Sequence, residues 1–167
     1  MHVSKFTPII ISSAVTIVIS LMPFVNFINL LCCGSVLIGV FTGTAFYNNQ
    51  LKSTGEFIQF KDGAAIGFLS GIISAITIVM FTTLLSMLMK QNPVPEMFKL
   101  IDQQGIKIPV EIDQFLQKIS EEYNKNGFSI TLTVMSLIAD IIFYPLFGTV
   151  GGLLSVSIFS RRKYASQ

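Results

Sequence analysis

Long runs without charge alternate with short polar segments along the chain, and this alternation predicts membrane-spanning helices. The apolar runs occupy residues 6–22, 28–47, 63–89 and 128–159. A helix needs about 20 apolar residues to cross a hydrocarbon core of roughly 30 Å. The first run is short for that distance and the second fits it. The third and fourth runs exceed it, so we expect these two helices to tilt or to project from the membrane.

A polar region, residues 90–127, separates the last two runs and is expected to hold two short helices, Glu96–Gln104 and Pro109–Lys125. In the second of these, apolar residues recur at steps of three and four, which predicts one apolar face. They are Ile112, Phe115, Leu116, Ile119 and Tyr123. The apolar face can pack on the end of the helical bundle, on lipid headgroups or on a partner.

The pattern therefore predicts an all-α, polytopic membrane protein in which residues 1–167 form a single membrane domain. Four transmembrane helices are expected to form a small bundle, and the polar link 48–62 joins the second span to the third. The region 90–127, with its two amphipathic helices, is expected to form a helical cap between spans three and four. Asp62 is expected to favour the start of the third helix, through capping and the helix dipole.

Composition supports membrane residence and excludes one class of partner. Hydrophobic residues make up 51% of the 167 residues, and charged residues make up only 12%. Soluble domains carry roughly 25% charged residues, so this chain has too little charge to cover a globule in water. The formal net charge is +2 and no basic stripe is present, so nucleic acid is not an expected partner.

The distribution of basic residues predicts how the spans are oriented. With four spans, both termini and the link 48–62 lie on one side of the membrane. That side carries Lys5, Lys52, Lys61, Arg161, Arg162 and Lys163. Basic residues near short loops mark the cytoplasmic side, so both termini are predicted to be cytoplasmic and the cap extracytoplasmic. The cap holds five lysines and six acids, spread over a long segment.

Small residues recur at every fourth position of the third span, namely Gly63, Gly67, Gly71 and Ala75. Such a stripe lets the backbone of a neighbouring helix approach closely, where van der Waals contact stabilises helix pairs in lipid. The second and fourth spans carry similar pairs, Gly39 with Gly43 and Gly148 with Gly152. The stripes predict either compact packing within one chain or an interface with a second copy or a membrane-protein partner.

Asp140 is the only acid well inside an apolar run. An ionisable residue at that depth is a functional hypothesis, as a site for a proton, for a cation or for a partner's base. Counting back about 20 residues from Phe159, however, places Asp140 near the outer boundary of the hydrocarbon core, where a structural role suffices. Tyr144 follows one helical turn later and could donate a hydrogen bond to Asp140.

The residue types that enzymes and metalloproteins need are not assembled in this sequence. His2 is the one histidine, so no histidine cluster and no cysteine–histidine set can hold zinc. No glycine-rich loop ends in Lys-Ser or Lys-Thr, as a phosphate-binding loop would. We therefore expect no catalytic residues, no metal and no cofactor, and we do not expect an enzyme.

Two stretches resemble those of a group of bacterial proteins. They are FKDGAAIGFLSGIISAI at Phe60–Ile76 and PLFGTVGGLLSVSIFSRRK at Pro145–Lys163. Together with the polar loop between them, they resemble bacterial four-helix membrane proteins grouped as domains of unknown function. The resemblance covers roughly residues 55–163. It implies a four-helix fold and a location in the bacterial cytoplasmic (inner) membrane, and it carries no catalytic residues.

These features lead to two functional hypotheses. The first is a structural, scaffold or accessory subunit that binds a protein partner or lipid. The alternative is a small transporter or channel that is active as an oligomer, with Asp140 as its proton or cation site. A continuous polar cavity reaching Asp140 would favour transport, and a dry interior would favour the first hypothesis.

Overall fold

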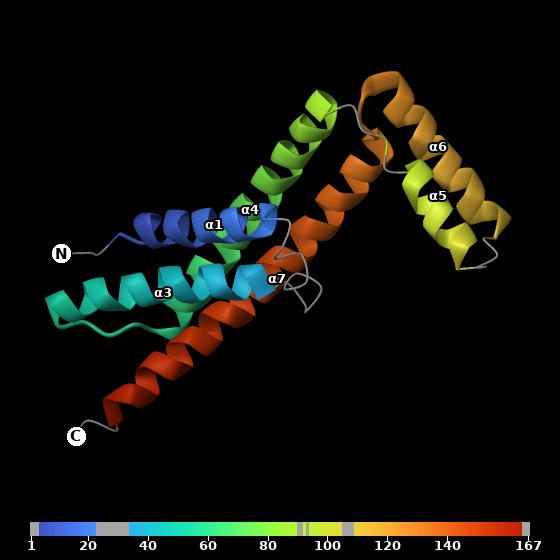
Figure 1. Ribbon diagram of the computed structural model, residues 1–167. Helices are drawn as coiled ribbons and strands as arrows, with labels where there is room; N and C mark the ends of the chain where they lie inside the picture. The colour runs from blue at the N-terminus through green and yellow to red at the C-terminus, as the bar shows by residue number, and fades with distance from the viewer. Residues whose placement is uncertain (1–3, 23–33, 90–91, 93, 105–108, 165–167) are drawn as a thin grey trace. The chain divides into compact units, whose positions relative to one another are not determined.

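In a computed structural model of the chain, the described residues with regular secondary structure are helical, as the sequence predicts. The description covers residues 4–22, 34–89, 92, 94–104 and 109–164, with only the backbone for 102 and 161–164. Its helices are α1 (Phe6–Leu21), α3 (Gly34–Thr54), α4 (Phe60–Met89), α5 (Val94–Gln103), α6 (Val110–Asn126) and α7 (Ile130–Tyr164) (Figure 1). The turn expected after the first span and the start of the second span lie outside the described residues.

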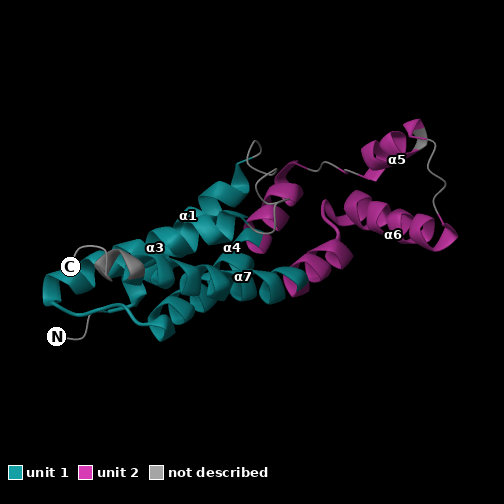
Figure 2. Cartoon of the chain, turned by 90° about the horizontal axis from the view of Figure 1, so that it is seen from below, with its two compact units in different colours: residues 1–78, 139–167 teal, residues 79–138 magenta. Residues whose placement is uncertain are grey.

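The chain divides into two compact units (Figure 2). Unit 1 comprises residues 1–78 and 139–167, and it contains α1, α3, the first part of α4 and the last part of α7. Unit 2 comprises residues 79–138, with the end of α4, both short helices and the start of α7.

In unit 1, α1 and α3 form an antiparallel pair. The Ser20 hydroxyl donates to the Ser35 hydroxyl at 3.0 Å near one end of the pair. Towards the other end, Gly43 lies against the carbonyl oxygen of Pro8, only 2.5 Å from where a Cβ on that glycine would be. Figure 1 shows the two helices side by side, running in opposite directions.

Each helix of this pair also contacts one of the two long helices. The Ser13 hydroxyl of α1 lies 3.4 Å from the carbonyl oxygen of Ser70 in α4. On the other side, the ring of Phe41 in α3 lies 5.3 Å from the ring of Phe159 in α7, measured between centroids. Because α4 and α7 also pack on each other, and a buried cluster draws residues from all four helices, the described helices of unit 1 form one bundle.

The polar link predicted at residues 48–62 is wrong at both ends. Helix α3 continues to Thr54 and α4 begins at Phe60. The extension of α3 is stabilised by packing, since Tyr47 and Leu51 join a buried apolar cluster and expose only 4% and 2% of their surfaces. Helix α3 ends at Gly55, whose positive φ of 75° allows the backbone to turn, and the Glu56 amide donates to the Leu51 carbonyl at 3.0 Å.

In unit 2, α5 and α6 pack together around Val94, Leu116 and Ile119, with Phe98 and Tyr123 against this cluster. Asn92 holds the start of α5 in place, because its side-chain oxygen accepts from the Val94 amide and its side-chain nitrogen donates to the Ser120 hydroxyl. The apolar face predicted for α6 is thus divided. Leu116 and Ile119 are buried within the chain, whereas Ile112 and Phe115 are exposed.

The junction between α6 and α7 is held by a carboxylate. Glu122 in α6 accepts hydrogen bonds from the Thr131 amide at 2.9 Å, from the Thr131 hydroxyl at 2.6 Å and from the Ser129 hydroxyl at 2.5 Å. The Ser129 hydroxyl also accepts from the Leu132 amide, so it caps the first turn of α7. These hydrogen bonds lower the pKa of the Glu122 carboxyl to about 2.

Two of the described helices are long and apolar enough to cross a membrane, namely α4 over Phe60–Met89 and α7 over Ile130–Ser160. Helix α1 is apolar but shorter. The described part of α3 does not pass the same test, because it ends in the polar segment Asn48–Thr54 and begins only at Gly34. The four predicted spans therefore correspond to two helices of spanning length and two helices that pack with them.

Candidate functional site

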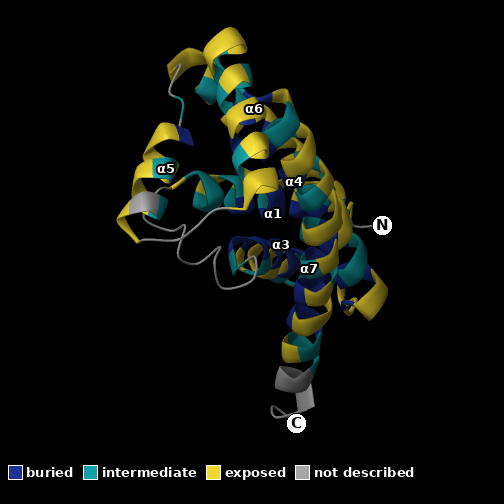
Figure 3. Ribbon diagram, turned by 90° about the vertical axis from the view of Figure 1, so that its right-hand side faces the viewer, coloured by how far each residue is buried: buried dark blue, intermediate teal, exposed yellow. Residues whose placement is uncertain are grey.

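The interior of unit 1 combines many small and hydroxyl-bearing residues with a limited set of apolar ones, such as Leu51, Ile66 and Val156. Among the described residues of this unit, seven serines and threonines expose 1% or less of their surfaces: Ser12, Thr16, Ser35, Thr44, Ser70, Ser74 and Ser155. Many large apolar side chains are exposed instead, including Ile10, Val18, Phe68, Ile142 and Leu154, each more than 40% exposed. Figure 3 shows buried and exposed positions alternating along the ribbon of α7. Soluble proteins bury their large apolar residues, so this arrangement is the reverse of that expected in water.

The glycines of α4 lie against the backbone of α7. A Cβ on Gly63 would come within 2.5 Å of the Gly152 carbonyl oxygen, and one on Gly71 would come within 2.7 Å of Pro145. Between these two positions, a Cβ on Gly67 would overlap the carbonyl group of Gly148. Real Cβ atoms do not approach other atoms so closely, so the two backbones touch only because these residues have no side chains.

The glycines of α3 have the same role against α1. A Cβ on Gly39 would lie 2.7 Å from the Ser12 carbonyl oxygen, and one on Gly43 would meet the Ser12 side chain. Ala75, the last member of the stripe on α4, is completely buried. The predicted small-residue stripes therefore face other helices of the same chain, and the surface they offered for a second copy is already occupied.

Three hydroxyl groups in this interior have no hydrogen-bond partner, namely those of Ser12, Thr44 and Ser74. Each belongs to a residue with 0% exposure, so water does not solvate it from outside. Their neighbours Ser13 and Thr16 donate instead to carbonyl oxygens one turn back on α1, both at 2.9 Å. The core thus contains buried hydroxyl groups beside apolar residues, and its helices meet closely at glycines.

Asp140 and Tyr144 lie one turn apart on α7, and both are partly exposed. Asp140 is not among the fully buried residues of the core, and the residues that follow it, Ile141, Ile142 and Phe143, are exposed. An open hollow of about 440 Å³ lies nearby and is lined by apolar side chains, among them Ile142 and Leu146. The hydrogen bond predicted between Asp140 and Tyr144 stays a prediction.

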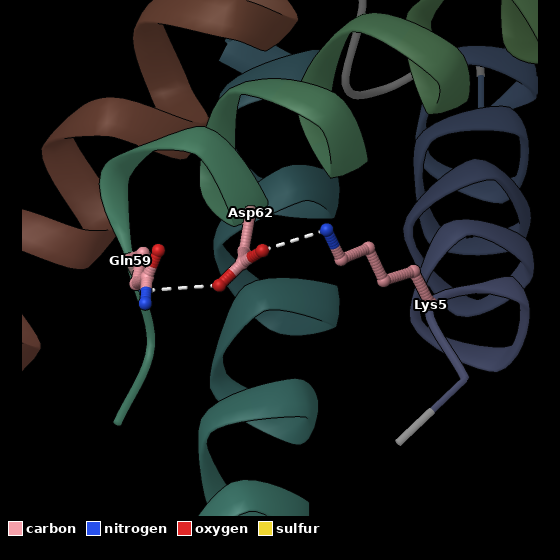
Figure 4. A network of polar contacts seen from close by, with 3 residues as sticks. All are labelled: Lys5, Gln59 and Asp62. Carbon is pink, nitrogen blue, oxygen red and sulfur yellow. Dashed lines mark hydrogen bonds and ion pairs between the residues drawn. The ribbon is translucent and has the colours of Figure 1, made fainter. Parts of the chain in front are cut away.

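A polar network at the start of α4 joins Asp62, whose capping role was predicted, to Lys5, whose contact with Asp62 was not. Asp62 accepts from the backbone amide of Gln59 at 3.0 Å, as expected of an acid that caps the first turn (Figure 4). Its second oxygen pairs with the Lys5 ammonium at 2.6 Å. Asp62 exposes only 7% of its surface. The hydrogen bond to Asp62 raises the pKa of Lys5 above its ordinary value.

The ion pair fixes the relative direction of two helices. Lys5 immediately precedes α1, and Asp62 lies in the first turn of α4, so the two helices begin at the same end of unit 1. No sequence signal joins two residues so far apart in the chain. Only the packing of α1 beside α4 brings them together.

The described residues contain no group of three or more His, Cys, Asp or Glu side chains that could hold a metal ion. Unit 1 contains close backbone contacts between helices, the ion pair of Lys5 with Asp62, and a partly exposed acid, Asp140. Comparison with protein-family models, with curated proteins and with solved structures found no match to this chain. Its function must therefore be argued from this geometry.

Proposed function

We propose that this chain is a four-span membrane protein with a structural, scaffold or accessory role, binding a protein partner or lipid without catalysing a reaction. The observation that carries the proposal is the reversed distribution of residues in unit 1. Many large apolar side chains lie on its outer surface, and its interior is rich in small and hydroxyl-bearing residues. Lipid solvates an apolar exterior without cost, and close packing of small residues holds helices together there.

The membership of α1 and α3 in unit 1 supports four spans rather than two. Both helices pack directly on α4 or α7, and both carry exposed apolar side chains, such as Ile10 and Val18 on α1 and Ile38 on α3. Because α1 and α3 belong to the same bundle as α4 and α7, their exposed side chains would face the same lipid.

The basic residues support an orientation with both termini in the cytoplasm. Lys5 and Lys61 lie at the starting ends of α1 and α4, which are adjacent in unit 1, and Lys52 lies in the last turn of α3. Positive charge at one end of a bundle marks the cytoplasmic side. The resemblance to bacterial four-helix membrane proteins supports the bacterial inner membrane as the location.

The closed core favours a static role over transport through a single chain. Helix pairs meet at glycine backbones, and the hydroxyls of Ser12, Thr44 and Ser74 belong to residues with 0% exposure. One observation favours the alternative, a transporter active as an oligomer. Asp140 lies beside exposed residues of α7 rather than in the core, so it is placed for a contact between subunits.

Two measurements test the proposal together. Carbonate extraction of membranes, with a side-specific reporter on each terminus and in the cap, tests insertion and orientation. Flux of protons and monovalent cations into proteoliposomes tests transport, with Asp140→Asn as the comparison. We expect a carbonate-resistant protein with cytoplasmic termini and no flux above that of empty liposomes. Flux that Asp140→Asn abolishes would replace the proposal with its alternative, and extraction by carbonate would refute membrane insertion.

A further inference from the structure

Unit 2 contains a hollow whose walls are unusually rich in hydroxyl groups. It has a volume of about 160 Å³ and lies among the end of α4, the end of α6 and the start of α7. Six of its lining residues carry a hydroxyl: Thr82, Thr83, Ser86, Tyr123, Thr133 and Ser136. The other walls are apolar, with Val79 and Leu132 among them.

Most of these hydroxyl groups already donate their single proton in a hydrogen bond to another oxygen of the chain. The Ser86 hydroxyl donates to the Thr82 carbonyl at 2.9 Å, and the Thr133 hydroxyl donates to the Ser129 carbonyl at 2.9 Å. Thr83 lies 3.4 Å from Thr133, and because the proton of Thr133 is engaged, Thr83 is the donor of that pair. A hydroxyl has one proton and two lone pairs, so these groups can offer a ligand only acceptor oxygens.

Charge of both signs lies near the hollow, since Lys125 is in the last turn of α6 and Glu122 is one turn earlier. Glu122 precedes Tyr123, and the hydrogen bonds from Ser129 and Thr131 keep its carboxylate ionised. Helix α6 also ends here, at Asn126, and the C-terminal end of a helix carries partial negative charge. Two aromatic residues, Tyr123 and Phe128, line the same hollow, and their ring faces attract cations.

We propose that this hollow binds a primary ammonium group, whose N–H donors complement its acceptor walls. The hollow, with a volume of about 160 Å³, is large enough for a small amine such as an aminoethyl group. Two sources can supply this chemistry, a free amine or the ethanolamine headgroup of a phospholipid.

The lipid source rests on the proposed membrane function and agrees with the position of the hollow along α4. Thr82 and Ser86 lie within two turns of the end of α4 at Met89, which is about 10 Å at 1.5 Å per residue. In a spanning helix, that distance from the end corresponds to the depth of the headgroups and the adjoining hydrocarbon. An ethanolamine headgroup would therefore reach the hollow without leaving the bilayer.

The test uses the full chain in detergent micelles, titrated with phosphatidylethanolamine, with phosphatidylcholine or with free ethanolamine, and binding is measured by native mass spectrometry. The variants Thr83→Val and Thr133→Val remove acceptor oxygens at nearly constant volume. Thr77→Val is the matched control, because Thr77 lies on the same helix, is exposed and does not line the hollow. Circular dichroism verifies that each variant is folded, and carbonate extraction measures membrane insertion separately.

We expect phosphatidylethanolamine to bind, and each hollow variant to weaken it roughly tenfold, as loss of one hydrogen bond to a charged donor does. Thr77→Val should bind like the unmodified chain. Equal binding of free ethanolamine would support the ammonium site and identify a soluble amine as sufficient. Phosphatidylcholine has no N–H donor, so equal binding of that lipid would overturn the proposal, as would hollow variants that bind normally. A chain that inserts into membranes but fails these tests leaves the proposed function standing.

Discussion

The two units of this chain bury different kinds of residue. Unit 1 buries serine, threonine and glycine together with a few apolar residues such as Ile66, and many of its large apolar side chains are exposed, whereas unit 2 buries Val94, Leu116 and Ile119. On α6, Lys118 and Glu121 are exposed, and Leu116 and Ile119 are buried. The burial of apolar side chains between α5 and α6 is typical of proteins in water. The close packing of small residues in unit 1 is typical of helices in lipid.

This difference in buried residues indicates which forces stabilise each unit. In lipid, association of helices gains little from burying apolar surface, so under the proposed membrane location unit 1 depends on backbone contact at glycines. In water, burial of Leu and Ile side chains supplies the stabilisation, so α5 and α6 depend on those side chains. Substitutions should therefore have opposite consequences in the two units, and four of them, in order of decreasing effect, test this contrast.

The largest effect is expected from Gly67→Ile in unit 1. Its Cβ would overlap the Gly148 carbonyl, and backbone atoms cannot move aside as a flexible side chain can. We expect the substitution to cost about 3 kcal/mol or more, enough to open the contact between α4 and α7. Unfolding of the detergent-solubilised protein in increasing dodecyl sulfate measures this loss. Thr77→Ile, at an exposed position of the same helix, is the control and should be nearly neutral.

The next effect is expected from Ile119→Ala in unit 2. Ile119 is 1% exposed and belongs to the buried cluster that joins α5 to α6. Removing its side chain should cost about 3 kcal/mol, through lost burial and the cavity left behind. Hydrogen exchange should accelerate in α5 and α6 and remain slow in unit 1. Ile112→Ala, at a half-exposed position of α6, should change exchange little, and equal effects of the two would contradict the assignment of the core.

Acid should loosen the junction between α6 and α7. The pKa of Glu122 lies at about 2 in the folded chain, below its ordinary value of 4.5. The stabilisation it provides is therefore complete above about pH 4.5 and is lost as the pH falls towards 2. Amide exchange at Thr131 and Leu132, corrected for intrinsic rates, should increase over that interval. Glu122→Gln should raise exchange at neutral pH and remove the pH dependence, while Glu121→Gln, at an exposed position, should do neither.

The smallest effect is expected from Ser74→Ala. The Ser74 hydroxyl is buried without a hydrogen-bond partner, so its removal forfeits no hydrogen bond. We expect a change in stability within about 0.5 kcal/mol, neutral or stabilising. Ser13→Ala is the matched comparison, because the Ser13 hydroxyl donates to the Ile9 carbonyl and lies close to Ser70. A marked destabilisation by Ser74→Ala would show that this hydroxyl has a partner in the membrane.

Local pattern was sufficient to predict the helices and the spacing of the glycines, because both depend on residues close together in the sequence. The helix partner of Gly67 could not be read from that spacing, since it depends on how α4 and α7 pair. The same limit explains the wrong boundary of α3. The polar residues after Tyr47 resemble a link, but burial of Tyr47 and Leu51 in the tertiary structure keeps that segment helical.

The polar features divide in the same way. The position of Asp62 at a helix start was predictable, whereas its pairing with Lys5 required α1 and α4 to lie side by side. The hydroxyl-lined hollow could not be predicted at all, because Thr83, Tyr123 and Thr133 come from three helices. The functional role of Asp140 stays a prediction, since neither its depth nor its partner follows from spacing along α7.

The central claim, that the exterior of unit 1 faces lipid, is tested most directly by footprinting the membrane-bound chain with two reagents. A lipid-soluble carbene should label Phe68, Ile142 and Leu154, which are each about half exposed, and an aqueous hydroxyl radical should spare them. Val36, Val40 and Ile66, at 1% exposure or less, should escape both reagents. Strong aqueous labelling of Phe68, Ile142 and Leu154, with little carbene labelling, would contradict the account.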